Sequence, residues 1–175
     1  MNSLPYDVLQ FCILDKLDFL SKIRFRQVCK KFYRLEIWDF YNIDIQYLYI
    51  LTDNILMGYP FIRKLNASYN SKITNVNYMT KLQVLHAGND CGIDDNGIKD
   101  LNLIELNAFN NSKITNVNHM TKLQILYARG DCGIDDNGIK DLNLIKLDSS
   151  DNSKITTVNH MTKLQVLNVH GIIIK

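Results

Sequence analysis

A stretch of fifteen residues occurs three times in this chain at a fixed distance of 41 residues. It reads SKITNVNYMTKLQVL at 71–85, SKITNVNHMTKLQIL at 112–126 and SKITTVNHMTKLQVL at 153–167. Between these copies the segment DCGIDDNGIKDLNLI occurs twice. One such copy cannot bury its apolar face alone, so neighbouring copies must stack into an elongated array with a shared core.

Each 41-residue copy divides into two units that follow the pattern LxxLxA. Twenty or twenty-one residues separate most units, which fits one short strand and one return segment per turn of a coil. We therefore predict a solenoid of about seven turns over residues 45–175, with a parallel sheet of short strands. The seven units are Ile45-Leu48-Ile50, Ile62-Leu65-Ala67, Leu82-Leu85-Ala87, Leu103-Leu106-Ala108, Leu123-Leu126-Ala128, Leu144-Leu147-Ser149 and Leu164-Leu167-Val169.

Strand alternation assigns the side chains of each unit to two faces. Leu106 and Ala108 are expected in the core, whereas Glu105, Asn107 and Phe109 are expected on the opposite, concave face. Seven strands about 4.8 Å apart would make this face about 29 Å wide, which suits a protein or peptide ligand.

Differences between the copies also favour a binding role for the concave face. The copies 62–102 and 103–143 differ at ten positions, and eight of these fall in 62–70 and 86–89 and their counterparts, which belong to the strands and their exits. Drift after a duplication is the alternative explanation. Aromatic and arginine side chains dominate interface energies, so Phe109, Tyr127 and Arg129 are the expected anchors. The predicted substrate-binding residues are Lys64, Asn66, Ser68, His86, Glu105, Asn107, Phe109, Tyr127, Arg129, Lys146, Asp148, Asn168 and His170.

The return segments contain residues that suit helix caps and tight turns. In GIDDNGIKDL, Asp94 or Asp95 is placed to cap a short helix. Asparagine side chains bond backbone groups in bends. We expect Asn70, Asn111 and Asn152 to close alternate turns in this way.

These units resemble the leucine-rich repeat family. The ITNVNHMTKLQIL portion is similar to the short type with an asparagine turn, and CGIDDNGIKDLNLIEL is similar to the cysteine-containing type. The resemblance implies an α/β leucine-rich repeat solenoid from residue 45 to the C-terminus. Alanine stands where leucine is usual at the last strand position, which implies a thinner core.

Residues 1–44 contain apolar residues at helical spacing and no LxxLxA unit, which predicts a separate, small all-helical domain. The segment LPYDVLQFCILDKLDFLSKIRFRQVCKKFYRL at 4–35 resembles an F-box, although one extra residue lies between Val8 and Leu17. The resemblance implies docking on the Skp-type adaptor of a cullin ubiquitin ligase. The implied adaptor-binding residues are Leu4, Pro5, Val8, Leu9, Ile13, Leu17, Leu20, Ile23 and Val28.

Composition and charge exclude several other classes. A net charge of +2 gives no overall attraction to nucleic acid or membrane, and no apolar run is long enough to span a bilayer. The four cysteines form no CxxC and are expected as buried thiols of a reduced, cytoplasmic protein. His119 and His160 recur at one repeat position and are expected in solvated turns, not as metal ligands. The sequence contains no phosphate loop, nucleophile elbow or metal cluster, so we expect neither a cofactor nor an enzyme.

The order of the two predicted parts indicates a function. An F-box followed by leucine-rich repeats is typical of substrate receptors that hold a protein for a ubiquitin ligase, and giant viruses of amoebae encode proteins of similar construction. A repeat scaffold with the N-terminal helices acting only as a cap is the alternative, because a coil needs its first turn covered. An enzyme with an unrecognised site is a third hypothesis. The last copy ends in GIIIK, so we expect this end to fray, dimerise or meet a partner.

Overall fold

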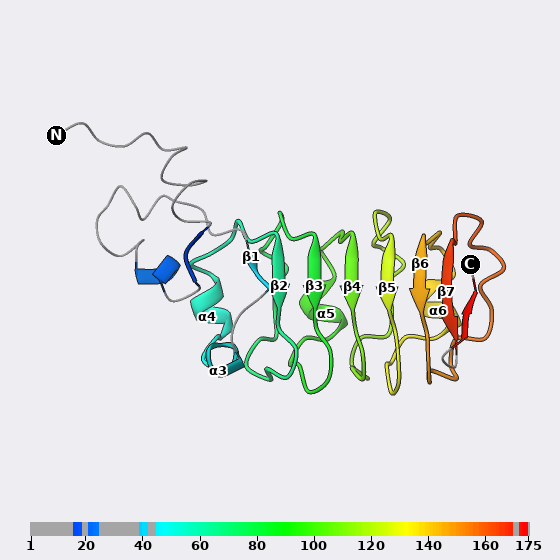
Figure 1. Cartoon of the computed structure of the whole chain (residues 1–175), viewed down its shortest axis with the longest axis horizontal. Helices are drawn as coiled ribbons and strands as arrows, with labels where there is room; N and C mark the ends of the chain where they lie inside the picture. The colour runs from blue at the N-terminus through cyan, green and yellow to red at the C-terminus, as the bar shows by residue number, and fades with distance from the viewer. Residues whose placement is uncertain (1–15, 19–20, 25–38, 42–44, 170–171, 175) are drawn as a thin grey trace.

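The computed structural model describes residues 16–18, 21–24, 39–41, 45–169 and 172–174. Its strands lie in one sheet, in the order in which they occur in the chain (Figure 1). The elements are β1 (Asp39–Phe40), α3 (Ile45–Leu48), α4 (Asp53–Leu56), β2 (Lys64–Asn66), β3 (Val84–His86), α5 (Asp95–Ile98), β4 (Glu105–Asn107), β5 (Ile125–Tyr127), α6 (Asp136–Ile139), β6 (Lys146–Asp148), β7 (Val166–Val169) and β8 (Ile172–Ile174).

Strands β1 to β7 are parallel, and their register aligns the repeat units. Leu65 pairs with Leu85, Leu85 with Leu106, and the alignment continues strand by strand to Leu167. The described residues form a parallel-strand β-solenoid of about five turns between β2 and β7, with few helices. The strand positions predicted for the second to seventh units are therefore confirmed.

The first predicted unit is wrong. Ile45–Leu48 is helix α3, and Ile50 is 55% exposed instead of pointing into the core. The first strand among the described residues is β1, whose Phe40 lies opposite Leu65, so the sheet includes residues of the 1–44 segment. A spacing of three residues between apolar positions fits a helical turn as well as the repeat unit, which explains the error.

The core is a continuous stack of repeated apolar positions. The central leucines of β2 to β6 and the alanines that follow β2 to β5 are fully buried, as the alternation predicted. Return segments complete the core from the other side with isoleucine, valine and methionine. The stack of one return position consists of Ile73, Ile114 and Ile155, and that of another consists of Met79, Met120 and Met161.

Buried asparagines close alternate turns, as predicted. Asn111 Nδ2 donates to the carbonyls of Ala87 (2.7 Å) and Ile93 (3.0 Å), and its Oδ1 accepts from Lys113 N (3.0 Å). Asn70 and Asn152 make the equivalent bonds one copy earlier and later. Each asparagine thus satisfies backbone groups that the bend leaves without a partner.

The two neighbouring aspartates of the return segment have different roles. Asp94 caps α5, because its Oδ1 accepts from Gly97 N (2.9 Å). Asp95 instead reaches the next turn, where it accepts from the backbone N (2.8 Å) and hydroxyl of Thr115. The structure thus selects Asp94 as the cap and shows that Asp95 joins successive turns.

The last parallel strand has a partner on its outer edge. Strand β8 pairs antiparallel with β7, with Leu167 opposite Ile174 and Val169 opposite Ile172. Strand β7 is therefore paired on both sides, and the expected fraying, dimerisation or partner contact of this end stays a prediction. Antiparallel pairing supplies the backbone partners that a further parallel turn would otherwise provide.

We predict that Asn111→Ala lowers the free energy of unfolding by about 2–4 kcal/mol, because buried carbonyls lose their donors. Chemical denaturation of the full chain measures the loss. Asn96→Ala is the matched control, since Asn96 is exposed in α5, and we expect a change within about 0.5 kcal/mol. Equal losses in the two variants would contradict a structural role for the buried amide.

Candidate protein-binding face

The side of the sheet that points away from the core carries three rows of side chains, which we call the sheet face. The strand register places residues of neighbouring strands side by side in each row. The first row is Lys64, Val84, Glu105, Ile125, Lys146 and Val166, the second is Asn66, His86, Asn107, Tyr127, Asp148 and Asn168, and the third is Ser68, Gly88, Phe109, Arg129 and Ser150.

Most of the predicted substrate-binding residues lie on the sheet face with accessible side chains. Phe109 and Tyr127 are half-buried and not sealed in the core, and Arg129 is exposed. The structure brings together Lys64, Asn66, Ser68, His86, Glu105, Asn107, Phe109, Tyr127, Arg129, Lys146 and Asn168 on this one surface. His170 lies outside the described residues. The role of all these residues in substrate binding stays a prediction.

Asp148 departs from the expectation of an open position, since it is only 6% exposed. Its Oδ1 accepts from Ser150 N (3.2 Å) and Ser150 Oγ (2.7 Å), and its Oδ2 accepts from Asn168 Nδ2 (3.3 Å). Arg129 Nε lies 3.7 Å from Oδ1. Asp148 therefore positions its neighbours on the face, while Asn168 Oδ1 is buried without a hydrogen-bond partner.

Two cations lie over two aromatic rings in the middle of the face. The guanidinium carbon of Arg129 is 5.5 Å from the ring centroid of Phe109, and Lys146 Nζ is 4.9 Å from that of Tyr127. Lys146 Nζ also donates to Tyr127 Oη at 3.2 Å. We call these four residues the β4–β6 patch. Stacking of this kind restrains the flexible cationic side chains. The aromatic rings below them are apolar surface that a ligand can cover.

A second cluster surrounds His86. Its Nε2 lies 2.9 Å from Tyr41 Oη and 3.7 Å from Glu105 Oε1. The Tyr41 and His86 rings also meet edge to face, with centroids 4.6 Å apart. Burial lowers the pKa of His86 below its usual value, against a smaller opposing effect of Glu105. The pKa of Tyr41 is raised, first by burial and then by the negative charge of Glu105.

Tyr41 is a residue of this cluster that was not predicted from the sequence. Tyr41 directly follows β1, and the pairing of Asp39 with Lys64 places it in the row of Asn66 and His86. The prediction missed Tyr41 because it placed the first strand at 45–50, so Tyr41 was not assigned to a row of the sheet face.

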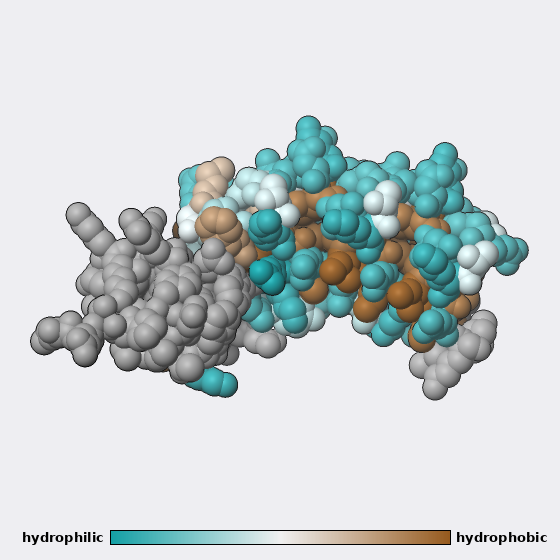
Figure 2. Space-filling model, turned by 90° about the horizontal axis from the view of Figure 1, so that it is seen from above, coloured by the Kyte–Doolittle hydropathy of each residue, from teal (hydrophilic) through white to brown (hydrophobic). Residues whose placement is uncertain are grey.

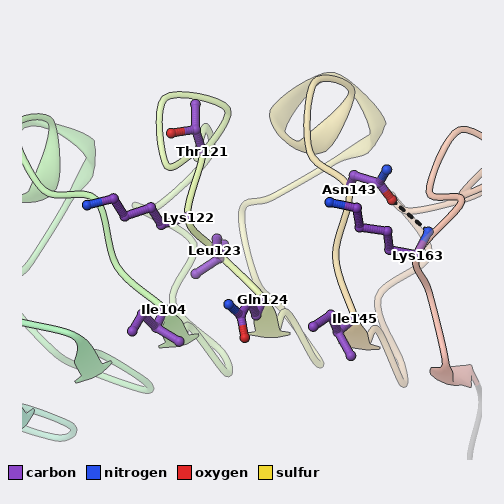
Figure 3. Close-up of a pocket in the computed structure, with 8 residues that line it drawn as sticks. All are labelled: Ile104, Thr121, Lys122, Leu123, Gln124, Asn143, Ile145 and Lys163. Carbon is purple, nitrogen blue, oxygen red and sulfur yellow. Dashed lines mark hydrogen bonds between the residues drawn. The ribbon is translucent and has the colours of Figure 1, made fainter.

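A shallow hollow of about 270 Å³ lies where β4, β5 and β6 begin, and it was also not anticipated. Seen from above relative to Figure 1, the repeats show apolar surface between polar side chains (Figure 2). Ile104, Gln124 and Ile145 come directly before the three strands, while Lys163 reaches in beside Asn143, whose Oδ1 accepts from the Lys163 backbone N (Figure 3). Thr121, Lys122 and Leu123 complete the lining.

The recurrent histidines have a structural explanation. His119 Nε2 and His160 Nε2 each lie 3.2 Å from a carbonyl in the preceding return segment, of Ile98 and Ile139 respectively. Tyr78, at the same repeat position, donates to Asp53 O at 3.4 Å. The shared property of the position is thus a bond between turns, which tyrosine and histidine both supply.

Metal and thiol chemistry find little support among the described residues. No group of three or more His, Cys, Asp or Glu side chains there could hold a metal ion. Cys91 and Cys132 are buried, as expected, and burial raises the pKa of each thiol to about 11. Both thiols are therefore protonated at neutral pH. Cys12 and Cys29 lie outside the described residues.

Only part of the predicted adaptor-binding set can be placed. Leu17 and Ile23 are partly buried and pack against the apolar core. The remaining members, Leu4, Pro5, Val8, Leu9, Ile13, Leu20 and Val28, lie outside the described residues. Among the helices that the structure describes, none has the length and apolar character needed to cross a bilayer.

Comparison with known proteins finds a family match for the N-terminal part of the chain. The family model of the F-box domain matches residues 1–37. No curated protein and no solved structure matches the chain. The F-box resemblance is therefore confirmed, and it suggests the role of an adaptor subunit in a ubiquitin ligase.

We predict that His86 makes stability depend on pH. Its pKa in the folded state lies below the ordinary value of 6.5, so the unfolded chain takes up more protons as the pH falls through this range. Stability therefore decreases on acidification. The variant His86→Asn carries the residue found at the equivalent position 168, and we expect a smaller loss of melting temperature between pH 7 and 5.5. A His86 pKa above 6.5 measured by NMR would contradict this assignment.

Proposed function

We propose that this chain is a substrate-receptor subunit of a cullin-type ubiquitin ligase. In this proposal the F-box at residues 1–37 docks a Skp-type adaptor, and the sheet face holds a protein substrate. The match to the F-box domain is the observation that carries the proposal. The receptor itself performs no chemistry, since holding a substrate close to the transfer machinery raises its effective concentration. Such a protein acts in the cytoplasm.

The solenoid suits the proposed substrate-binding role. Parallel strands β2 to β7 span five intervals of about 4.8 Å, which gives a face about 24 Å wide. We propose that it is a leucine-rich repeat solenoid, because LxxLxA units recur every 20 or 21 residues and asparagines close alternate turns. A face of this width accommodates a protein segment better than a small molecule.

The packing of Leu17 and Ile23 against the core favours a second candidate function. In that alternative, the N-terminal residues only cover the first turn of the coil, and the chain is a protein-binding scaffold without a ligase. The two candidates differ in adaptor binding, which is therefore the property to test.

We predict that the full chain copurifies with a Skp-type adaptor and that Leu4→Asp combined with Pro5→Ala abolishes copurification. The new carboxylate would disrupt an apolar contact at the adaptor. Circular dichroism checks that the repeats of the variant stay folded. Lys64→Ala is the control, because Lys64 lies on β2 of the solenoid, and it should keep the adaptor. Binding that survives the double substitution, or its absence in the unmodified chain, would favour the scaffold.

A second test addresses the sheet face. We predict that Phe109→Ser with Tyr127→Asn reduces the yield of captured proteins at least tenfold, because aromatic anchors dominate interfaces. Both replacements occur at equivalent positions of this chain, as Ser150 and Asn168. Affinity mass spectrometry with the full chain as bait measures the yield, and adaptor recovery serves as internal standard. Lys140→Ala, an exposed change directly after α6, is the control. Unchanged capture by the double variant would place substrate binding elsewhere.

A further inference from the structure

We infer that the β4–β6 patch binds an extended acidic peptide segment, whose carboxylates are taken by Arg129 and Lys146. The inference rests on the function proposed above and specifies the class of substrate. Four observations carry it: the charge that remains free on the face, the fixing of the two cations, the distribution of these residues among the copies, and the spacing of the rows.

The negatively and positively charged side chains of the sheet face differ in how accessible they are to a partner. The carboxylate of Asp148 is nearly buried and bonded to Ser150 and Asn168. Glu105 faces His86 at 3.7 Å. The Arg129 side chain, in contrast, is 46% exposed. The carboxylate beside Arg129 is thus engaged within the protein, and the charge that the four residues of the patch offer to a partner is positive.

The guanidinium of Arg129 is fixed in a way that leaves its end open. Phe109 lies beneath it and Asp148 faces its Nε atom. Among the described residues, none is hydrogen-bonded to the two Nη atoms of Arg129. A guanidinium end of this kind binds a carboxylate through two parallel hydrogen bonds. Because the side chain is already held by the protein, less conformational entropy is lost on binding.

The combination of residues is specific to one place in the solenoid. Serine stands at the position of Phe109 in the preceding and following copies, and glycine stands at the position of Arg129 in the preceding copy. At Gly88 a Cβ atom would come 2.9 Å from the backbone oxygen of Phe109, so a larger residue has no room there. In this copy Arg129 follows β5 and lies beside Phe109, which follows β4.

The row positions define the ligand further. Arg129 belongs to the third row and Lys146 to the first, with Tyr127 of the second row between them. In an extended peptide, alternate residues point to the same side at intervals of about 6.7 Å, which matches the spacing of rows along a strand. Asp131 and Asp151 are exposed in the turns beyond the third row. Since these aspartates would repel a carboxylate, we expect the ligand's carboxylates to lie between these turns and the start of the strands. They would all project from one side of the peptide.

The test uses the full chain and two fluorescent nine-residue peptides in which threonine alternates with either glutamate or glutamine. We expect the glutamate peptide to bind at least tenfold more tightly by fluorescence anisotropy at low salt, and to weaken as salt is added. Arg129→Gln and Lys146→Gln should each weaken it about tenfold. Lys140→Gln is the matched control and should change little, since it also removes one exposed positive charge but lies directly after α6 in a return segment.

Several outcomes would overturn the inference. Equal affinity for the two peptides, or no binding of the glutamate peptide at millimolar concentration, excludes carboxylate recognition. An equal loss in Lys140→Gln and Lys146→Gln shows unspecific attraction. A ten-nucleotide oligouridine that binds more tightly than the glutamate peptide, with the same dependence on Arg129, assigns the patch to nucleic acid. Melting temperatures of the variants check that they are folded.

Failure of this inference can be told apart from failure of the proposed function. If captured proteins still require Phe109 and Tyr127 while the glutamate peptide does not bind, the receptor function stands and the acidic class is wrong. If the adaptor does not bind but the glutamate peptide does, the ligase function is wrong and the specificity of the face stands.

Discussion

The alignment of one leucine from each of the strands β2 to β7 is the constraint on which the rest of the structure depends. Leu65, Leu85, Leu106, Leu126, Leu147 and Leu167 lie side by side across β2 to β7. A slip of one residue in any strand would turn its leucine to the sheet face and its polar neighbours into the core. Since each turn is covered only by adjacent turns, the register of one strand depends on that of the next.

Polar side chains in the bends make this stacking possible. A coil with turns of 20 or 21 residues bends sharply and carries backbone carbonyls into the interior, where each needs a donor. Asn70, Asn111 and Asn152 supply these donors, and Asp95 joins its return segment to the following one. Because these positions are fixed by backbone bonding, much of the chemical variety among the copies lies in the outward rows.

The repeat period of the sequence predicts the structural features that are common to all copies, but not those that occur in a single copy. The inward direction of Leu106 and Ala108 followed from strand alternation, because that property is the same in every copy. Ile45 was misassigned, because a spacing of three residues is shared by a helix and the repeat unit. Alternation also gives the direction of a side chain but not its depth. Asp148 is outward and yet nearly buried, because Ser150 and Asn168 lie against it, and such contacts depend on residues that differ between copies.

The start of the sheet connects the two parts of the chain. Phe40 of β1 is fully buried and packs against Tyr59, while Tyr41 directly after it meets His86 on the sheet face. Leu17 and Ile23 pack on the same continuous core. A receptor that works by proximity requires a fixed distance between its docking segment and its substrate, since a loose connection lowers the effective concentration. If the chain is the substrate receptor proposed above, the packing of Leu17 and Ile23 on the core would contribute to this fixed distance as well as cover the first turn.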